Sequence, residues 1–233
     1  MKRIYTFFAS LILGITAIAQ NAKPTITFFS IDEDAEISMT EGESNTCQAP
    51  LEITCTGNIE SPDGYSYIPE WRIFDTSVGE SEIILTRYED NTSYTLTSSG
   101  SYGIKLYVTF INGTDTIEHQ SEQMTITISE SSFSCPNAFS PNGDGINDVF
   151  KFNYKSIIEF EAVIFNRWGQ KIRSLNMNDI DDGWDGRQGG NYVKDGVYFI
   201  NINAVGSDGI KYEIKKAINV LKGFKETDET GGA

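Results

Sequence analysis

Alternation of apolar and polar residues along short segments is the feature that most constrains the fold of this chain. Between residues 102 and 110 every second position is apolar, as Tyr102, Ile104, Leu106, Val108 and Phe110. A period of two places these side chains on one face of a half-buried strand. Asn112-Gly113 follows, a dipeptide typical of two-residue hairpin turns, so residues 114–129 are expected to return antiparallel.

Other short strands are expected before and after this hairpin, and helix signals are almost absent. The expected strands cover residues 25–29, 51–56, 69–74, 82–87, 92–97, 149–154, 157–166, 170–174 and 195–205, and a last strand from Ile210 to Leu221. In the last strand the apolar positions shift before Ala217, which predicts a β-bulge. Many short strands separated by turns are typical of β-sandwiches. The expected fold class is all-β.

Length and charge divide the chain into two parts. The 233 residues suffice for two domains of about 100 residues each. Residues 20–134 carry a net charge of −15, whereas residues 135–233 carry −2. The overall charge of −15 disfavours nucleic acid and anionic lipid as partners. The two parts are therefore expected to have different roles.

The N-terminus has the pattern of a signal peptide over residues 1–19. Lys2 and Arg3 precede an apolar run, and Ala17-Ile18-Ala19 fits a cleavage site before Gln20. The alternative is a membrane anchor, but the run of about 15 residues is shorter than the about 20 that a spanning helix needs. Export by the Sec pathway is the expected route.

The three cysteines allow two interpretations. Cys47 and Cys55 are separated by an even number of positions, so both would lie on one face of a continuous strand, and an oxidising compartment permits a disulfide between them. Alternatively, Cys47, Cys55 and Cys135 are all free thiols. A zinc site is disfavoured because the chain has no CxxC pair and its one histidine is His119.

The first half, residues 20–130, resembles an immunoglobulin-like or PKD-type domain. Trp71 stands where such a domain has its core tryptophan, and Gly100-Ser101-Tyr102 fits a tyrosine corner. The segment from Cys47 to Ile53 is similar to the opening strand of that family. The polar residues 131–136, which end in Pro136, are expected to form an exposed linker to a second domain, residues 137–233.

The second half contains the most specific segment, Asn137-Ala138-Phe139-Ser140-Pro141-Asn142-Gly143-Asp144-Gly145-Ile146-Asn147-Asp148-Val149-Phe150. Glycines and Asx residues at this density predict a tight loop with positive φ angles. Arg167-Trp168-Gly169 is expected to form a turn, with Trp168 as a structural residue. Gly183-Trp184-Asp185-Gly186 predicts a second loop, whose tryptophan would close the end of the sandwich.

These motifs, in this order, resemble the gliding motility-associated C-terminal domain, also called the type B sorting domain of the type IX secretion system. The resemblance covers about residues 135–223, with a tail after it. It implies an immunoglobulin-like sandwich, and therefore two such sandwiches in tandem. It also implies delivery to the cell surface or outside the cell by the type IX translocon, with a PorP-like outer-membrane partner. Asp115-Thr116-Ile117 is similar to the O-glycosylation acceptor of bacteria that have this system, with Thr116 as the acceptor.

A metal site and an enzymatic site are the two chemical alternatives. Asn142, Asp144, Asn147 and Asp148 offer oxygen ligands suited to calcium, but their order departs from the EF-hand, so an Asx-capped turn without an ion is the other interpretation. His119 lacks a catalytic context, and Asp181 and Asp182 share one turn. We expect a non-enzymatic protein.

Exposed aromatic residues would give the first half a different function. Trp71, Tyr65, Tyr67 and Tyr88 could stack on sugar rings or belong to the core. The alternative function is therefore a glycan-binding or adhesin module that the C-terminal domain delivers.

Overall fold

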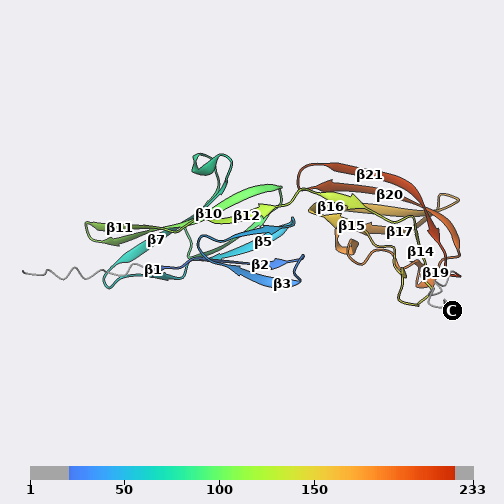
Figure 1. Ribbon diagram of the computed structural model, residues 1–233, viewed down its shortest axis with the longest axis horizontal. Helices are drawn as coiled ribbons and strands as arrows, with labels where there is room; N and C mark the ends of the chain where they lie inside the picture. The colour runs from blue at the N-terminus through green and yellow to red at the C-terminus, as the bar shows by residue number, and fades with distance from the viewer. Residues whose placement is uncertain (1–20, 224–233) are drawn as a thin grey trace, which may run out of the picture.

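The computed structural model describes residues 21–223, which form two β-sandwiches placed end to end (Figure 1). The expected signal peptide, with its cleavage site between Ala19 and Gln20, and the tail after residue 223 lie outside the described residues. Within residues 21–223 no helix has the length and apolar character needed to cross a membrane.

The N-terminal domain is built from two sheets that enclose one core. Its elements are β1 (Asn21–Ala22), β2 (Thr25–Ser30), β3 (Ala35–Met39), β4 (Ser44–Cys47), β5 (Leu51–Thr56), β6 (Ile59–Glu60), β7 (Ser66–Asp75), the 3-10 turn η1 (Gly79–Ser81), β8 (Ile83–Arg87), β9 (Asn91–Leu96), β10 (Gly100–Asn112), β11 (Asp115–Gln120) and β12 (Met124–Ile128). One sheet has the order β4-β12-β10-β7-β8, with β11 also paired to β10, and the other has the order β3-β2-β5-β9.

Strand β10 shows the predicted alternation of buried and less buried residues from Ile104 to Ile111. Its even-numbered apolar residues from 102 to 110 are all buried, and the hairpin at Asn112-Gly113 joins it to β11. Trp71 on β7 is 1% exposed and lies opposite Leu106 of β10. The hydroxyl of Tyr102 donates to the carbonyl of Ser98 at 2.8 Å, the hydrogen bond of a tyrosine corner. The immunoglobulin-like pattern of this half is therefore present in its core.

The return from the hairpin differs from the single strand expected over residues 114–129. It is divided into β11 and β12, which pair with different parts of β10. Ser121 lies between them, and its buried hydroxyl accepts the N–H of Leu106 at 2.9 Å. This bond replaces a strand-to-strand bond where the chain crosses from one pairing to the next.

The C-terminal domain has one five-stranded sheet and a smaller opposite layer. Its elements are β13 (Ser132–Ser134), β14 (Ala138–Phe139), β15 (Asn153–Lys155), β16 (Ile157–Asn166), β17 (Lys171–Asn176), the 3-10 turn η2 (Met177–Asp179), β18 (Arg187–Gln188), β19 (Asn191–Tyr192), β20 (Gly196–Gly206) and β21 (Lys211–Val220). The sheet has the order β14-β21-β20-β16-β17, and two-stranded pairs β13-β15 and β18-β19 lie outside it.

The bulge expected in the last strand is absent from β21. Its register with β20 runs without a break from Lys211 to Val220, and Ala217 is exposed on the outer face. The apolar shift at Ala217 therefore reflects an exposed small residue and not a change of register. The register of this sheet shifts instead along β16, at Ile164 and Phe165 in its pairing with β17 and between Ile157 and Glu159 in its pairing with β20.

The segment 131–136 is not only an exposed linker, because it contains β13. Phe133 in this strand packs 5.8 Å from the rings of both Phe152 and Phe160. Ser131 binds the carboxylate of Asp208 through its N–H, at 2.9 Å, and through its hydroxyl, at 2.7 Å. Phe133 and Ser131 thus pack residues 131–136 against the second domain, and the domain boundary falls before Ser131.

Hydrogen bonds between loops join the two sandwiches at a junction centred on Ser156. Its hydroxyl accepts the N–H of Ala49 at 3.2 Å, and its own N–H donates to the side chain of Gln48 at 3.3 Å. The N–H of Ser99 donates to the carbonyl of Ser207 at 3.0 Å. Ser156 is fully buried and has a φ of 49°, so it fills a tight turn at the contact. The junction therefore fixes the domains end to end.

The disulfide considered between Cys47 and Cys55 is not formed, and all three cysteines are free thiols. Cys47 lies on β4 and Cys55 on β5, in opposite sheets of the sandwich. Their even spacing would place them on one face only if a single strand contained both. Burial raises the pKa of Cys47 to about 11 and that of Cys55 to about 12.

Candidate functional site

The two Gly/Asp loops of the C-terminal domain meet at its distal end, far from the junction (Figure 1). Phe150 follows the first loop, and its N–H donates to the carbonyl of Trp184 at 2.9 Å. The N–H of Trp184 in turn donates to the carbonyl of Phe150 at 3.1 Å. This reciprocal bridge connects segments that are far apart in the sequence, and we call the paired loops, residues 139–150 and 181–187, the distal loops.

Trp184 closes the end of the sandwich beneath the distal loops. It is 1% exposed, and its ring centroid lies 5.3 Å from that of Phe139 and 5.7 Å from that of Tyr198. Its indole N–H donates to the carbonyl of Arg187 at 3.0 Å. Aromatic pairs at these separations stabilise a core beyond the area they bury.

Two glycines are required because the distal loops approach each other closely. Gly183 has a φ of 69°, and a Cβ there would overlap the carbonyl oxygen of Phe150. Gly186 has a φ of 75°, and its Cβ would lie 2.8 Å from the ring of Pro141. Any larger residue at either position would push the two loops apart.

The first distal loop is organised around the carboxylate of Asp148. One of its oxygens accepts the N–H groups of Asn142, at 2.9 Å, and Gly143, at 2.7 Å, and the other accepts that of Gly145 at 2.8 Å. Asp144 similarly accepts the N–H of Ile146 at 2.9 Å. These backbone hydrogen bonds lower the pKa of Asp148, because they stabilise its ionised form.

The four residues considered as calcium ligands have the geometry of an Asx-capped turn. Gly143, Gly145 and Asn147 have φ angles of 83°, 87° and 52°, as expected for a tight loop. The carbonyl of Asn147 accepts the N–H of Ser140 at 2.8 Å. Backbone N–H groups hydrogen-bond to both oxygens of Asp148, so the loop is closed by its own backbone. Among residues 21–223 no three His, Cys, Asp or Glu side chains gather as a metal site.

Trp168 differs from its expected structural role, because its side chain is 81% exposed. The turn that carries it is built by Asn166, whose side-chain oxygen accepts the N–H groups of Trp168, at 2.9 Å, and Gln170, at 3.0 Å. Gly169 supports the turn with a φ of 77°. The guanidinium of Arg167 lies 5.3 Å from the centre of the indole ring. The turn therefore needs the backbone of Trp168 and not its indole.

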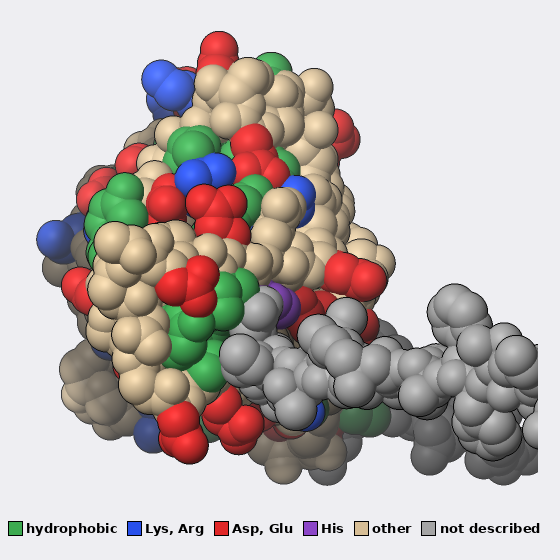
Figure 2. All heavy atoms as spheres, turned by 90° about the vertical axis from the view of Figure 1, so that its left-hand side faces the viewer, with side chains coloured by type: hydrophobic (Ala, Val, Ile, Leu, Met, Phe, Trp, Pro, Cys, Tyr) green, Lys and Arg blue, Asp and Glu red, His purple; other side chains and the backbone are tan. Residues whose placement is uncertain are grey.

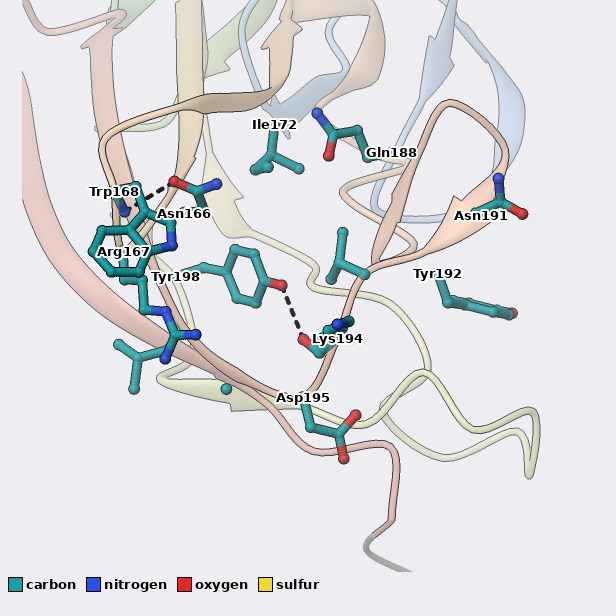
Figure 3. A pocket seen from close by; sticks show the side chains of 13 residues that line it. Asn166, Arg167, Trp168, Ile172, Gln188, Asn191, Tyr192, Lys194, Asp195 and Tyr198 are labelled. Atoms are coloured by element: carbon teal, nitrogen blue, oxygen red, sulfur yellow. Dashed lines mark hydrogen bonds between the residues drawn. The ribbon is translucent and has the colours of Figure 1, made fainter.

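An open cleft of about 500 Å³ lies beside this turn (Figure 3). Trp168 and Tyr192 stand on opposite sides of it, and Lys194, Asp195 and Tyr198 lie between them. The guanidinium of Arg187 is 4.2 Å from the centre of the Tyr192 ring. Concave sites of this size are common places for ligands and partners.

The sequence interpretation missed a second tyrosine corner in this cleft. The hydroxyl of Tyr198 donates to the carbonyl of Lys194 at 2.9 Å. Gly196-Val197-Tyr198 repeats the spacing of Gly100-Ser101-Tyr102, and the two glycines have φ angles of 142° and 141°. The repeated Gly-x-Tyr spacing was the signal that would have identified it.

The aromatic residues considered for glycan binding are mostly engaged within the N-terminal domain. Trp71 is buried, the hydroxyl of Tyr65 donates to Asp115, and that of Tyr67 donates to Asp90 at 2.9 Å. Tyr88 is 63% exposed. Of the four rings, Trp71 belongs to the core, Tyr65 and Tyr67 are half-buried against it, and Tyr88 is exposed.

The remaining predicted residues are spread over other elements. Thr116 is exposed on β11, opposite Ile111 of β10. His119 lies on the same strand, opposite Val108. Asp181 accepts the hydroxyl of Tyr154 at 2.6 Å, so it contributes to the packing of the C-terminal domain.

Comparison with known proteins identifies the C-terminal domain. No curated protein matches the chain. Among solved structures, the dimeric latent PorU from Porphyromonas gingivalis is 12% identical with a TM-score of 0.26, over 85% of this chain and 20% of that one. The FN1–FN3 domains of chicken CNTN1 are 12% identical with a TM-score of 0.25, over 78% of this chain and 70% of that one. Residues 133–220 match the family of the CHU_C type IX secretion signal domain, as the motifs predicted, so the C-terminal sandwich of this chain is a domain of that kind.

Proposed function

We propose that this protein is a non-enzymatic cargo of the type IX secretion system, in which the C-terminal sandwich is the address and the acidic N-terminal sandwich is the passenger. The observation that carries the proposal is the match over residues 133–220, which coincides with one complete sandwich. The junction and the boundary before Ser131 separate this sandwich from the passenger.

The distal loops are the part of the address that meets the secretion machinery. They lie at the end of the molecule opposite the passenger (Figure 1), and the reciprocal bridge between Phe150 and Trp184 holds them in one conformation. Ile146, at the tip of the first loop, is 48% exposed. A preorganised loop loses little conformational entropy on binding. We assign its partner to the translocon, with a PorP-like outer-membrane protein as the component that it contacts.

The passenger has an acidic surface and protonated thiols. Figure 2 shows one end of this domain, where Asp and Glu side chains outnumber Lys and Arg. The raised pKa values of Cys47 and Cys55 keep both sulfurs in the thiol form near neutral pH, which is unsuited to a nucleophile. These features support a binding or spacer role, with delivery to the cell surface or release from it.

Transfer of the address to another passenger tests the proposal. A periplasm-directed fluorescent protein fused to residues 131–233 is expected to leave a cell that has this secretion system. The fusion point follows the structure, because Ser131 binds Asp208 of the address. A chain that ends at Glu130 is expected to fold and to remain in the periplasm. Export of that truncated chain at the level of the full chain would refute the assignment.

Substitutions in the first distal loop test whether the secretion machinery recognises the C-terminal domain through this loop. Valine at Gly143 or Gly145 forces a β-branched residue to a φ of 83° or 87°, and export of the fusion is expected to fall. Gly209→Val is the matched control, since Gly209 has a φ of 79° and open space around it but lies near the junction. Equal loss of export in all three variants would indicate general destabilisation.

Glycan binding by the passenger is the alternative function. A glycan array probed with the full chain and with Tyr88→Ala tests it, since Tyr88 is the exposed ring among the four considered. Binding that depends on Tyr88 would favour the adhesin interpretation.

A further inference from the structure

The exposed indole of Trp168 is the most prominent apolar side chain that neither the fold nor the distal loops explain. It stands on a turn whose geometry Asn166 provides, and Val197, which is 46% exposed, lines the same cleft. Phe199, which is 45% exposed, follows on the outer face of the sheet, opposite Phe165 of β16. Contiguous exposed apolar side chains mark interaction surfaces. We call Arg167, Trp168, Val197 and Phe199 the knob.

Basic side chains lie within and beside the knob. Arg167 lies over the indole ring, and Lys171 is paired with Phe165 at the edge of the sheet. Asp195 is the acidic residue of the adjoining cleft, and it is engaged by Lys222, at 3.7 Å, and by the N–H of Gly223, at 3.3 Å. The knob therefore suits an apolar surface that carries carboxylates.

The N-terminal domain has a hollow of this complementary kind. Strands β2 and β5 pair only from Thr25 to Thr27, and a hollow of about 530 Å³ opens beyond the pairing. Phe29 and Ile31, which are 55% and 60% exposed, line it. Pro50 also lines the hollow, together with the exposed carboxylate residues Glu36 and Glu52. We call these five lining residues the acidic hollow.

We propose that the knob of one molecule docks into the acidic hollow of a second copy of this chain. The indole of Trp168 packs against Phe29 and Ile31, and the guanidinium of Arg167 pairs with Glu36 and Glu52. Opposite charges around complementary apolar surfaces favour this partner. Because the junction holds the two domains end to end, the knob and the hollow of one chain stay apart. The two surfaces differ, so a single contact leaves one free knob and one free hollow, which can bind further copies in open chains or closed rings.

Sedimentation equilibrium of the purified full-length chain tests this docking. The average mass is expected to rise with protein concentration and to fall as salt is added, because salt screens the pairs between Arg167 and the two glutamates. Trp168→Ala and Glu52→Arg are each expected to weaken self-association by about tenfold or more, as for a central interface residue. Tyr88→Ala is the control, since Tyr88 is 63% exposed but lies in neither surface.

Mixing the two weakened variants gives the decisive result. Trp168→Ala keeps an intact hollow and Glu52→Arg keeps an intact knob, so the mixture is expected to form dimers of one molecule of each and nothing longer. A wild-type chain that stays monomeric up to millimolar concentration overturns the proposal, as does a Trp168→Ala variant that associates like wild type. A monomeric wild type whose export is reduced by Trp168→Ala overturns it too, and assigns the knob to the secretion machinery.

Discussion

Replacement of Gly183 by alanine should separate the distal loops while leaving the rest of the C-terminal sandwich in place. The added Cβ overlaps the carbonyl oxygen of Phe150, which accepts the N–H of Trp184 in the reciprocal bridge. The oxygen cannot move away without breaking that hydrogen bond, since Phe150 is fully buried. The loops must therefore part at the point where they are joined.

Two contributions set the size of the effect. A left-handed φ of 69° costs alanine about 1–2 kcal/mol relative to glycine. A buried backbone group that loses its hydrogen-bond partner costs a further ~1–3 kcal/mol. Gly209→Ala supplies a control for the first contribution alone, because Gly209 has a φ of 79° and no atom within 4 Å of the added Cβ. The difference between the two variants is thus about 1–3 kcal/mol.

Hydrogen exchange and thermal unfolding measure this difference. For a domain of this size each kcal/mol lowers the melting temperature by roughly 4–8 °C, so Gly183→Ala should melt at least about 4 °C below Gly209→Ala. Peptides that contain Phe150 or Trp184 should exchange faster in the first variant, which assigns the effect to the C-terminal domain. Equal stability of the two variants, with the amide of Trp184 still protected, would refute the steric argument.

Three further predictions concern the junction, the first distal loop and the thiols. Ser156→Ala leaves a backbone N–H of the N-terminal domain without its acceptor, and the free energy of unfolding should fall by about 1–3 kcal/mol in urea titrations. Because its backbone hydrogen bonds lower the pKa of Asp148 below the ordinary value of 3.8, their stabilisation is complete above that pH and is lost as the pH falls through the lowered value. Melting temperatures from pH 6 to pH 2 should therefore drop less in Asp148→Asn than in wild type, and millimolar calcium at pH 7 should not change them. A thiol reagent at pH 8 should label Cys135, which is partly exposed, before Cys47 and Cys55, and denaturation should equalise the three rates.

The alternation of apolar and polar residues predicted the strands that have one buried face and one exposed face. The alternation from Tyr102 to Phe110 identified β10, and the expected ranges 51–56 and 157–166 coincide with β5 and β16. The buried positions of β5, and those of β16 from Phe160 to Ile164, recur with a period of two, which depends only on the strand itself. Short edge strands such as β3 and β4 were missed, because few of their residues face the core.

Local sequence patterns did not predict features that depend on contacts between residues far apart in the sequence. Trp168 and Trp184 both stand beside glycines in turns, yet one is 81% exposed and the other 1%. The difference comes from Phe139 and Phe150, which surround Trp184 from another part of the chain. The spacing of Cys47 and Cys55 likewise says nothing of which sheet each strand joins. The overlap at Gly183 also becomes visible only when Phe150 is placed next to it.

The junction at Ser156 joins two domains of unequal net charge, and this makes the whole molecule electrically asymmetric. With the sandwiches placed end to end (Figure 1), the charge of −15 on residues 21–134 and of 0 on residues 135–223 gives the rod a permanent dipole along its axis. Near an anionic membrane this dipole experiences a torque within a Debye length of about 8–10 Å. An anionic surface therefore repels the N-terminal domain of the rod more strongly than the C-terminal domain.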